Sequence, residues 1–320
     1  MPIIKYEATN FPKAMGTKLV GTHKIQVSWS ELVWAAISVG RANLIHILQH
    51  GAFSQFEIIY RAAILFANLR EDLQGNLRRS AAYEGLDPSE KGAISYFLGL
   101  AVTKLLADKL MNTPWLMHLD VYRALVKPIF SGAGRPDLVG QNSAGDWVVF
   151  ESKGRTNGFD PQVLQRAKQQ AMQIATIGGA TPILRVGAVT HFGMGALAVK
   201  ISDPPSSSKE AINIQLNRKQ LNDGYYRPFR EWLSSGTESR RIRSGDKDYR
   251  VKSLVSADIE VGIIESLTEG VPADVPSIQR ETSTVIGNTF HGKDGLLVRV
   301  GSLWSQGNMR LQPQERVGGN

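Results

Sequence analysis

The stretch GRPDLVGQNSAGDWVVFESKGR, residues 134–155, contains two apolar runs separated by the polar segment QNSAGD (141–146). Asn, Ser, Gly and Asp are the residues of hairpin turns, so the stretch predicts two antiparallel strands. Side chains alternate between the two faces of a strand, which places Glu151 and Lys153 on one face. Antiparallel pairing brings Asp137 beside Glu151. The hairpin therefore gathers three charged side chains where core residues are expected.

Two carboxylates that converge without a cation repel each other, and the pKa of one of them rises. A divalent cation between Asp137 and Glu151 removes this repulsion, and oxygen ligands suit Mg²⁺, with Mn²⁺ as a substitute. The main-chain carbonyl of Ser152 is a further candidate ligand. Lys153 is then placed to orient or deprotonate a water molecule, or to offset charge on a phosphate. These residues predict a metal site.

The composition is that of a soluble globular protein. The chain has 320 residues, 42% hydrophobic and 21% charged, which is enough for a sizeable core. It has no cysteine, which excludes disulfides, thiolate metal sites and cysteine nucleophiles. No apolar run approaches the roughly 20 residues that cross a bilayer, and the N-terminus has no signal-peptide pattern. We expect a cytoplasmic protein without a membrane partner.

The net charge of +8 is compatible with a polyanionic partner such as nucleic acid. Residues 218–252 are rich in arginine and lysine, whereas residues 258–281 are mostly acidic. This pattern has two interpretations. Either the chain presents two solvated surfaces of opposite sign, or the basic stretch forms a face next to a nucleic acid.

Hydrophobic periodicity divides the chain into three parts. The first part is predicted to be helical, and the second alternates helices and strands. Helices are expected at 28–51, 54–72, 87–112 and 160–178, and strands at 115–126, 135–140, 146–155, 182–192 and 196–201. The Pro/Ser-rich segment 202–210 marks a boundary, and a mixture of helix and strands follows it. This order predicts an α/β layer with helices against a mixed sheet.

The motif RPD, a turn and then ESK resembles the PD-(D/E)xK nuclease superfamily, and the order of elements around it is similar too. This resemblance implies a restriction-endonuclease-like mixed sheet flanked by helices. It implies a nuclease core over 87–203, with an N-terminal helical region at 1–86 and a C-terminal α+β appendage at 204–320. By resemblance, Asp137 and Glu151 ligate the metal and Lys153 is the catalytic lysine.

Members of the superfamily also use residues outside the hairpin. Glu90 is the candidate for an additional metal ligand, although it also completes a helix capping box. Asp120 is a second candidate. Gln169 is the candidate polar residue on the helix after the motif. It belongs to a stripe of glutamines that recur every four residues, Gln165, Gln169 and Gln173, and such a stripe is otherwise a solvated face. Arg135 and Arg155 flank the motif, where a guanidinium is suited to bind a phosphate.

The function implied is Mg²⁺-dependent hydrolysis of DNA phosphodiester bonds, in the setting of a restriction or anti-phage defence effector. RNA is an alternative substrate. Cleavage of a duplex by one site per chain favours a homodimer, and a multi-protein complex is the other arrangement expected. The alternative from a different class is a non-catalytic nuclease-like module that binds nucleic acid or a protein partner.

Overall fold

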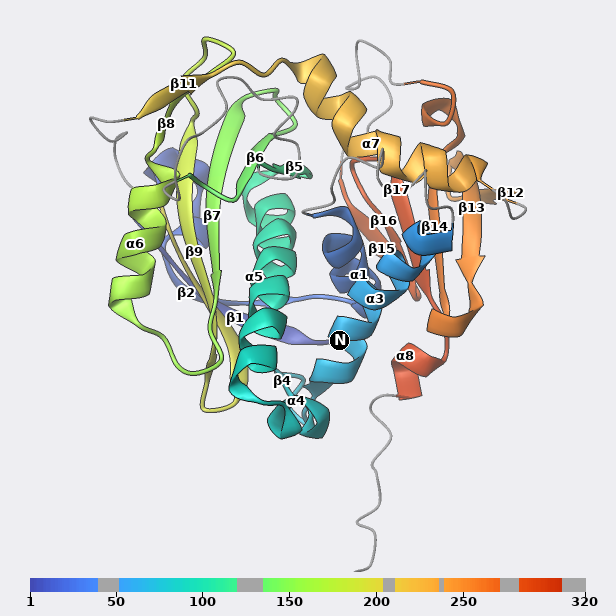
Figure 1. Cartoon of the computed structure of the whole chain (residues 1–320), viewed down its shortest axis with the longest axis horizontal. Coiled ribbons are helices and arrows are strands. Elements are labelled where there is room, and N and C mark those ends of the chain that lie inside the picture. The colour runs from blue at the N-terminus through green and yellow to red at the C-terminus, as the bar shows by residue number, and fades with distance from the viewer. Residues whose placement is uncertain (40–51, 120–134, 204–210, 236–238, 271–281, 307–320) are drawn as a thin grey trace, which may run out of the picture.

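The computed structural model describes residues 1–39, 52–119, 135–203, 211–235, 239–270 and 282–306 (Figure 1). Within these residues the chain is mixed α/β. It has seven α-helices, a nine-stranded mixed sheet and a separate six-stranded antiparallel sheet near the C-terminal end. No helix among the described residues is both long and apolar enough to span a membrane.

The nine-stranded sheet has the order β2-β1-β10-β9-β7-β6-β5, and β3 and β4 branch from β10. Its strands are β1 (Ile3–Thr9), β2 (Gly21–Gln26), β3 (Leu69–Glu71), β4 (Leu77–Arg79), β5 (Trp115–His118), β6 (Leu138–Gln141), β7 (Trp147–Gly154), β9 (Leu184–Gly193) and β10 (Ala196–Ser202). Strands β5, β6 and β7 are antiparallel neighbours, whereas β7 and β9 are parallel. The predicted hairpin is therefore β6–β7, in the interior of the sheet.

Two helices cover opposite faces of strands β7 and β9: α5 (Pro88–Met111) and α6 (Pro161–Ala171) (Figure 1). On the α6 face, a Cβ atom on Gly187 would lie 2.8 Å from the main-chain nitrogen of Lys168. On the α5 face, a Cβ atom on Gly154 would lie only 1.7 Å from the carbonyl oxygen of Ser95. Glycine at these two positions lets both helices approach the strand backbone directly.

Local sequence explains the bounds of α5. Asp87 caps its first turn and accepts hydrogen bonds from the N–H groups of Ser89 and Glu90, and Pro88 occupies the first helical position. At the other end, Asn112 adopts a left-handed conformation with φ of 53°, which stops the helix. Both ends agree with the prediction from sequence.

The C-terminal sheet has the order β12-β13-β14-β17-β16-β15. Its strands are β12 (Arg240–Ser244), β13 (Lys247–Leu254), β14 (Ile259–Ile264), β15 (Thr284–Ile286), β16 (Thr289–His291) and β17 (Leu296–Val300). The remaining elements are α1 (Trp29–Ser38), α3 (Ala52–Asn68), α4 (Ala81–Gly85), α7 (Arg218–Ser234), α8 (Leu303–Gln306) and the two-stranded sheet β8 (Ile174–Ile177) and β11 (Ile212–Ile214). Helix α1 joins the two sheets into one core, because its Trp34 ring packs 4.9 Å from the ring of Phe290.

The expectation that residues 1–86 are helical is wrong for part of this region. Strand β1 pairs in parallel with β10, and β2 extends the same sheet. The side chains of β1 alternate between buried and more exposed positions, with Ile4, Tyr6 and Ala8 buried, as expected of a strand with one covered face. The boundaries proposed at 86/87 and 203/204 stay predictions.

Helix α6 is shorter than the predicted helix at 160–178. It ends at Ala171, and residues 174–177 form β8, which pairs with β11. The segment IATI contains three β-branched residues, which favour a strand once a partner strand is available. The second half of the helix predicted at 28–51 lies outside the described residues, and so does the distal part of the strand predicted at 115–126.

Candidate functional site

The structure brings the three charged residues of the hairpin together. Strands β6 and β7 pair with Leu138 opposite Phe150, which places Asp137 opposite Glu151. The N–H of Asp137 donates a 2.8 Å hydrogen bond to Oε2 of Glu151. The Lys153 ammonium forms an ion pair with Oε1 of the same carboxylate. The juxtaposition that the hairpin pattern predicted is therefore present.

Burial differs sharply among these three residues. The side chain of Glu151 is 1% exposed, whereas that of Lys153 is 33% exposed. Asp137 is partly buried. Glu151 is opposite Gly187 on β9, and α6 packs directly on Gly187, so this helix covers the carboxylate. The site therefore combines the buried carboxylate of Glu151 with the partly accessible side chains of Asp137 and Lys153.

Burial and, to a smaller extent, the negative charge of Asp137 raise the pKa of Glu151, and Lys153 acts in the opposite direction, so that the pKa is about 8. A single ammonium therefore does not fully compensate the two carboxylates. A second positive charge near Asp137 and Glu151 would lower this pKa and favour the ionised form.

The oxygen atoms at the site fit a hard divalent cation. The N–H of Ser152 donates a 3.0 Å hydrogen bond to Oδ2 of Asp137. Because the N–H and C=O of one strand residue point to the same side, the Ser152 carbonyl also faces the side where Asp137 lies. The donors are then the two carboxylates of Asp137 and Glu151 and this carbonyl.

In the described part of the chain, no group of three or more His, Cys, Asp or Glu side chains is placed to hold a metal ion. Mg²⁺ keeps several water ligands and commonly binds through only one or two carboxylates. The donor set at the hairpin therefore suits Mg²⁺ or Mn²⁺ better than a cation that needs a complete cage of protein ligands.

The structure does not bring Glu90 to the hairpin. Its carboxylate accepts a 3.2 Å hydrogen bond from the N–H of Asp87 and completes the capping box of α5. Helix α5 lies on the face of the sheet opposite to the Glu151 side chain. Ser95 of α5 contacts Gly154 at the end of β7, and the first turn of the helix, with Glu90, lies beyond that contact and away from Glu151. The exposed Glu90 is thus a helix cap, and its assignment as a metal ligand finds no support in this geometry.

Gln169 also points away from the site. Helix α6 packs on the sheet through Val163, Ala167 and Ala171, which recur every four residues. Gln169 is exposed and lies about 200° around the helix from Ala167. Gln169 therefore lies on a solvated face of α6.

The two arginines that flank the motif differ in their surroundings. Arg155 donates a 3.0 Å hydrogen bond to the carbonyl of Gly158 and lies 3.4 Å from Asp160, the N-cap of α6. It thus orders the loop between β7 and α6, and its side chain stays 30% exposed. Arg135 is partly buried, and Asp120 lies outside the described residues. Phosphate binding by either arginine stays a prediction.

The structure adds a contact that the sequence did not reveal. Thr103 of α5 donates a 3.0 Å hydrogen bond to the hydroxyl of Ser152, and both side chains are buried. This contact fixes β7 against α5 on the face opposite to Glu151. No sequence pattern pairs these two residues, because the match between a helix and a strand 49 residues away depends on the fold.

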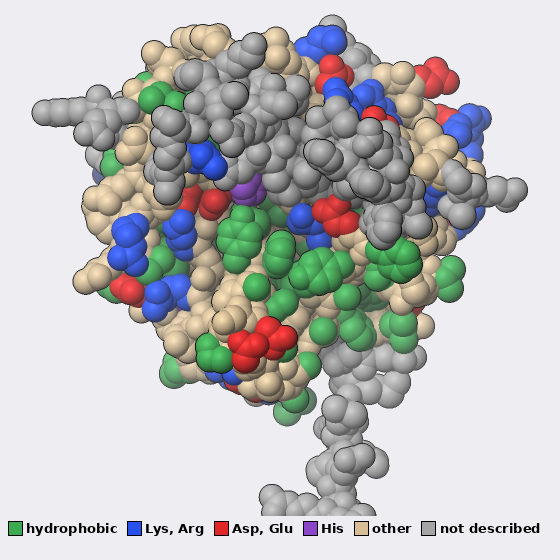
Figure 2. Space-filling view, viewed as in Figure 1, with side chains coloured by type: hydrophobic (Ala, Val, Ile, Leu, Met, Phe, Trp, Pro, Cys, Tyr) green, Lys and Arg blue, Asp and Glu red, His purple; other side chains and the backbone are tan. Residues whose placement is uncertain are grey.

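Three arginines of the basic stretch pair with carboxylates of the acidic stretch, and Figure 2 shows Lys and Arg side chains beside Asp and Glu side chains on the surface. Arg240 pairs with Glu260, and Arg241 and Arg250 both contact Glu265 at 2.8 and 2.7 Å. Strands β13 and β14 are neighbours, so a strand of the basic stretch lies beside a strand of the acidic stretch in one sheet. Part of the charge is neutralised within the protein, which weakens the interpretation of this stretch as a nucleic-acid face.

Comparison of the chain with protein-family models, with curated proteins and with solved structures found no match.

Proposed function

We propose that this protein is a divalent-cation-dependent nuclease that hydrolyses phosphodiester bonds in DNA, with the β6–β7 hairpin as its active site. The observation that carries the proposal is the convergence of Asp137 and Glu151 on paired strands, with Lys153 two residues further along the same face. Two carboxylates are suited to hold a divalent cation, and a lysine is suited to stabilise charge on the phosphate.

The order of elements supports the finer fold assignment, a restriction-endonuclease-like core. Helix α5 precedes the antiparallel strands β5, β6 and β7, and α6 then leads to β9, which is parallel to β7. The PD-(D/E)xK superfamily has the same sequence of helix, motif-bearing hairpin, helix and strand. The resemblance in the sequence and the topology around the hairpin thus agree.

In this proposal Asp137, Glu151 and the Ser152 carbonyl hold Mg²⁺ or Mn²⁺. A cation held by these groups would polarise a phosphate oxygen and lower the pKa of a water molecule. Lys153 orients the attacking water and offsets the negative charge that develops on the phosphate. The Lys153 side chain is partly exposed, so a bound substrate could contact it.

Catalysis by this arrangement requires Lys153 to move. Its ammonium now occupies Oε1 of Glu151, and a cation bound to that oxygen would displace it. Once displaced, the ammonium is free to contact water or phosphate instead of a carboxylate. The ion pair is thus the resting arrangement of the site.

The same ion pair supports a second candidate, a non-catalytic module that keeps the nuclease-like fold for binding. Glu151 is almost fully buried, and a lysine already satisfies one of its oxygen atoms. In this alternative the charges of the hairpin stabilise the fold and no cation enters. The two candidates predict opposite results in a cleavage assay.

The test uses the full chain with plasmid DNA, single-stranded DNA and RNA, each with Mg²⁺, Mn²⁺ or EDTA. The nuclease proposal predicts cleavage that requires a cation and is abolished by Asp137→Asn and by Lys153→Ala. Asp223→Asn and Lys219→Ala are matched controls, because these residues form a surface ion pair within α7. Cleavage in EDTA, or cleavage unchanged by both hairpin variants, would refute the proposal. RNA cleavage alone would assign the site to RNA.

A further inference from the structure

Helix α3 presents an apolar face to the solvent. Its side chains are described over residues 55–68, and each exposed residue there is aromatic or alanine: Phe56, Tyr60, Ala63, Phe66 and Ala67. Phe56 is 61% exposed and Tyr60 is 53% exposed. A surface helix normally turns its polar residues outward, and α3 does the opposite. Figure 2 shows hydrophobic side chains gathered over α3 and the neighbouring part of α5.

The charged side chains of α3 are used inside the molecule. Glu57 and Arg61 form an ion pair at 2.9 Å. Arg61 also donates hydrogen bonds to the carbonyl oxygens of Ala36 and Val39 at the end of α1. These contacts anchor α3 to α1. Within the described part of the helix, they leave the outward face without a charged residue.

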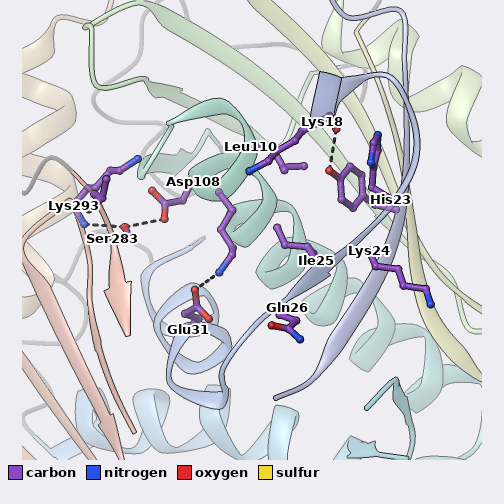
Figure 3. A pocket seen from close by; sticks show the side chains of 13 residues that line it. Lys18, His23, Lys24, Ile25, Gln26, Glu31, Asp108, Leu110, Ser283 and Lys293 are labelled. Carbon is purple, nitrogen blue, oxygen red and sulfur yellow. Dashed lines mark hydrogen bonds and ion pairs between the residues drawn. The ribbon is translucent and has the colours of Figure 1, made fainter. Parts of the chain in front are cut away.

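The helices beneath this face are fixed to one another. Helix α3 packs on both α1 and α5. Lys109 of α5 forms an ion pair with Glu31 of α1, shown by the dashed line at Glu31 in Figure 3. The ring of Tyr60 lies 6.1 Å from the ring of Phe97 in α5, edge to face. A surface held in this way loses little conformational entropy when it associates with a partner.

The apolar patch extends beyond α3 to two neighbouring elements. Tyr96 of α5, which contacts Phe97, is 39% exposed. The 3₁₀ helix η4 (Val255–Ala257) packs against α3, and its Val255 is 86% exposed. With aromatic side chains of roughly 200 Å² each, the patch exposes roughly 500 Å². A standard interface buries about 800 Å² per partner, a little more than half of it apolar. The patch is therefore large enough to supply the apolar part of one dimer interface.

The outward stripe of α3 is complementary to its own reversed copy. Phe56, Tyr60, Ala63 and Ala67 are spaced by four, three and four residues, so they lie along one side of the helix. The two large side chains come first and the two small ones follow. A two-fold axis midway between Tyr60 and Ala63 pairs two such helices antiparallel. It places Tyr60 opposite Ala63 of the second copy, and Phe56 opposite Ala67 of the second copy.

We propose that this face of α3 is the interface of a homodimer, in which the α3 helices of two copies pack antiparallel. Each large ring then meets an alanine, which lets the two helices approach closely. Parallel pairing would instead set ring against ring and leave the alanines facing a gap. The proposal rests on the surface of α3 alone and does not depend on nuclease activity.

The first test is sedimentation of the full chain in EDTA over a range of protein concentrations. We expect a dimer that dissociates on dilution. Tyr60→Glu and Ala63→Lys should each weaken it by at least about tenfold, because each variant buries two unpaired charges per dimer. Met194→Glu is the matched control and should leave the dimer unchanged. Met194 is 98% exposed and lies in the turn between β9 and β10, outside the patch.

A mixture of the two interface variants tests the antiparallel pairing itself. In a mixed dimer, the glutamate at position 60 of one copy faces the lysine at position 63 of the other. The second pair remains tyrosine against alanine. An equimolar mixture of Tyr60→Glu and Ala63→Lys should therefore dimerise at least about tenfold more tightly than either variant alone.

Three results would overturn the proposal. A wild-type chain that stays monomeric at all concentrations would mean that something other than a second copy, such as a different protein, covers α3. A dimer that persists in both interface variants would place the contact on another surface. Absence of rescue in the mixture would contradict the antiparallel pairing. Asp137→Asn should dimerise like the wild type, so the dimer is tested separately from cleavage.

Discussion

The N–H of Asp137 donates a 2.8 Å hydrogen bond to Oε2 of Glu151, so the two acidic residues of the hairpin are joined by the backbone of one and the carboxylate of the other. This contact sets the position of the buried carboxylate without neutralising it. Lys153 supplies the only ammonium paired with Glu151 among the described residues. One ammonium thus faces two carboxylates, and this imbalance should affect both the pH dependence of stability and the binding of cations.

The first prediction concerns pH. The pKa of Glu151 rises from 4.5 to about 8 in the folded chain, mainly through burial, so the folded state binds this proton more tightly than the unfolded state. Its contribution to stability is therefore complete below about pH 4.5 and is lost as the pH rises toward about 8. Glu151→Gln cannot ionise, so its melting temperature relative to the wild type should rise across this window. Thermal unfolding followed by circular dichroism measures the difference, and a difference that does not change with pH contradicts the prediction.

The second prediction concerns the packing of α5 on β7. In Gly154→Ala the new Cβ would lie 1.7 Å from the carbonyl oxygen of Ser95, so helix and strand must separate. We expect a loss of about 1–3 kcal/mol in the free energy of unfolding. Gly158→Ala is the matched control, because a Cβ there meets no atom within 4 Å. Urea denaturation measures both variants, and equal stability would show that the close approach is absent.

The third prediction concerns the hydrogen bond between Thr103 and Ser152. Thr103→Val removes the donor and leaves a buried hydroxyl without its partner, whereas Ser152→Ala keeps the main-chain carbonyl of the candidate site. A double-mutant cycle on the free energy of unfolding should give a coupling of about 0.5–1.5 kcal/mol. Additive effects of the two substitutions would mean that the two hydroxyls do not interact.

The fourth prediction separates the helix cap from the metal site. Glu90→Gln should retain cleavage activity, because glutamine also completes a capping box and the residue lies away from the hairpin. Asp87→Ala should lower the free energy of unfolding by about 1 kcal/mol through loss of the N-cap. Gln169→Ala should also leave the rate unchanged. A large loss of the cleavage rate in Glu90→Gln would instead restore its assignment as a ligand.

The sequence predicts the hairpin and its charged residues because the information is local. A turn segment fixes the register, and alternation then fixes which side chains share a face with Glu151. The capping box that Asp87 and Glu90 form on α5 is local in the same way, and it is present.

What the sequence does not predict depends on distant partners. Strand β1 pairs with β10 almost 200 residues away, although the alternation of Ile4, Tyr6 and Ala8 with the charged Lys5 and Glu7 is a usable signal in the sequence. The side of α6 that faces the sheet, and hence the exposure of Gln169, depends on its contact with Gly187. Periodicity identifies which residues share one face of a helix, but it does not show whether that face packs on the sheet or faces solvent.

The fifth prediction addresses the central claim, that Asp137 and Glu151 form a divalent-cation site for which Lys153 now supplies the counter-charge. The direct measurement is calorimetric titration of Mn²⁺ into the Lys153→Ala variant, compared with the wild type and with Lys153→Ala combined with Asp137→Asn. Removal of the ammonium frees Oε1 of Glu151, so Lys153→Ala should bind Mn²⁺ more tightly than the wild type and yet fail to cleave DNA. The added Asp137→Asn change should abolish this binding. Absence of Mn²⁺ binding in Lys153→Ala, or binding that survives Asp137→Asn, would contradict the claim.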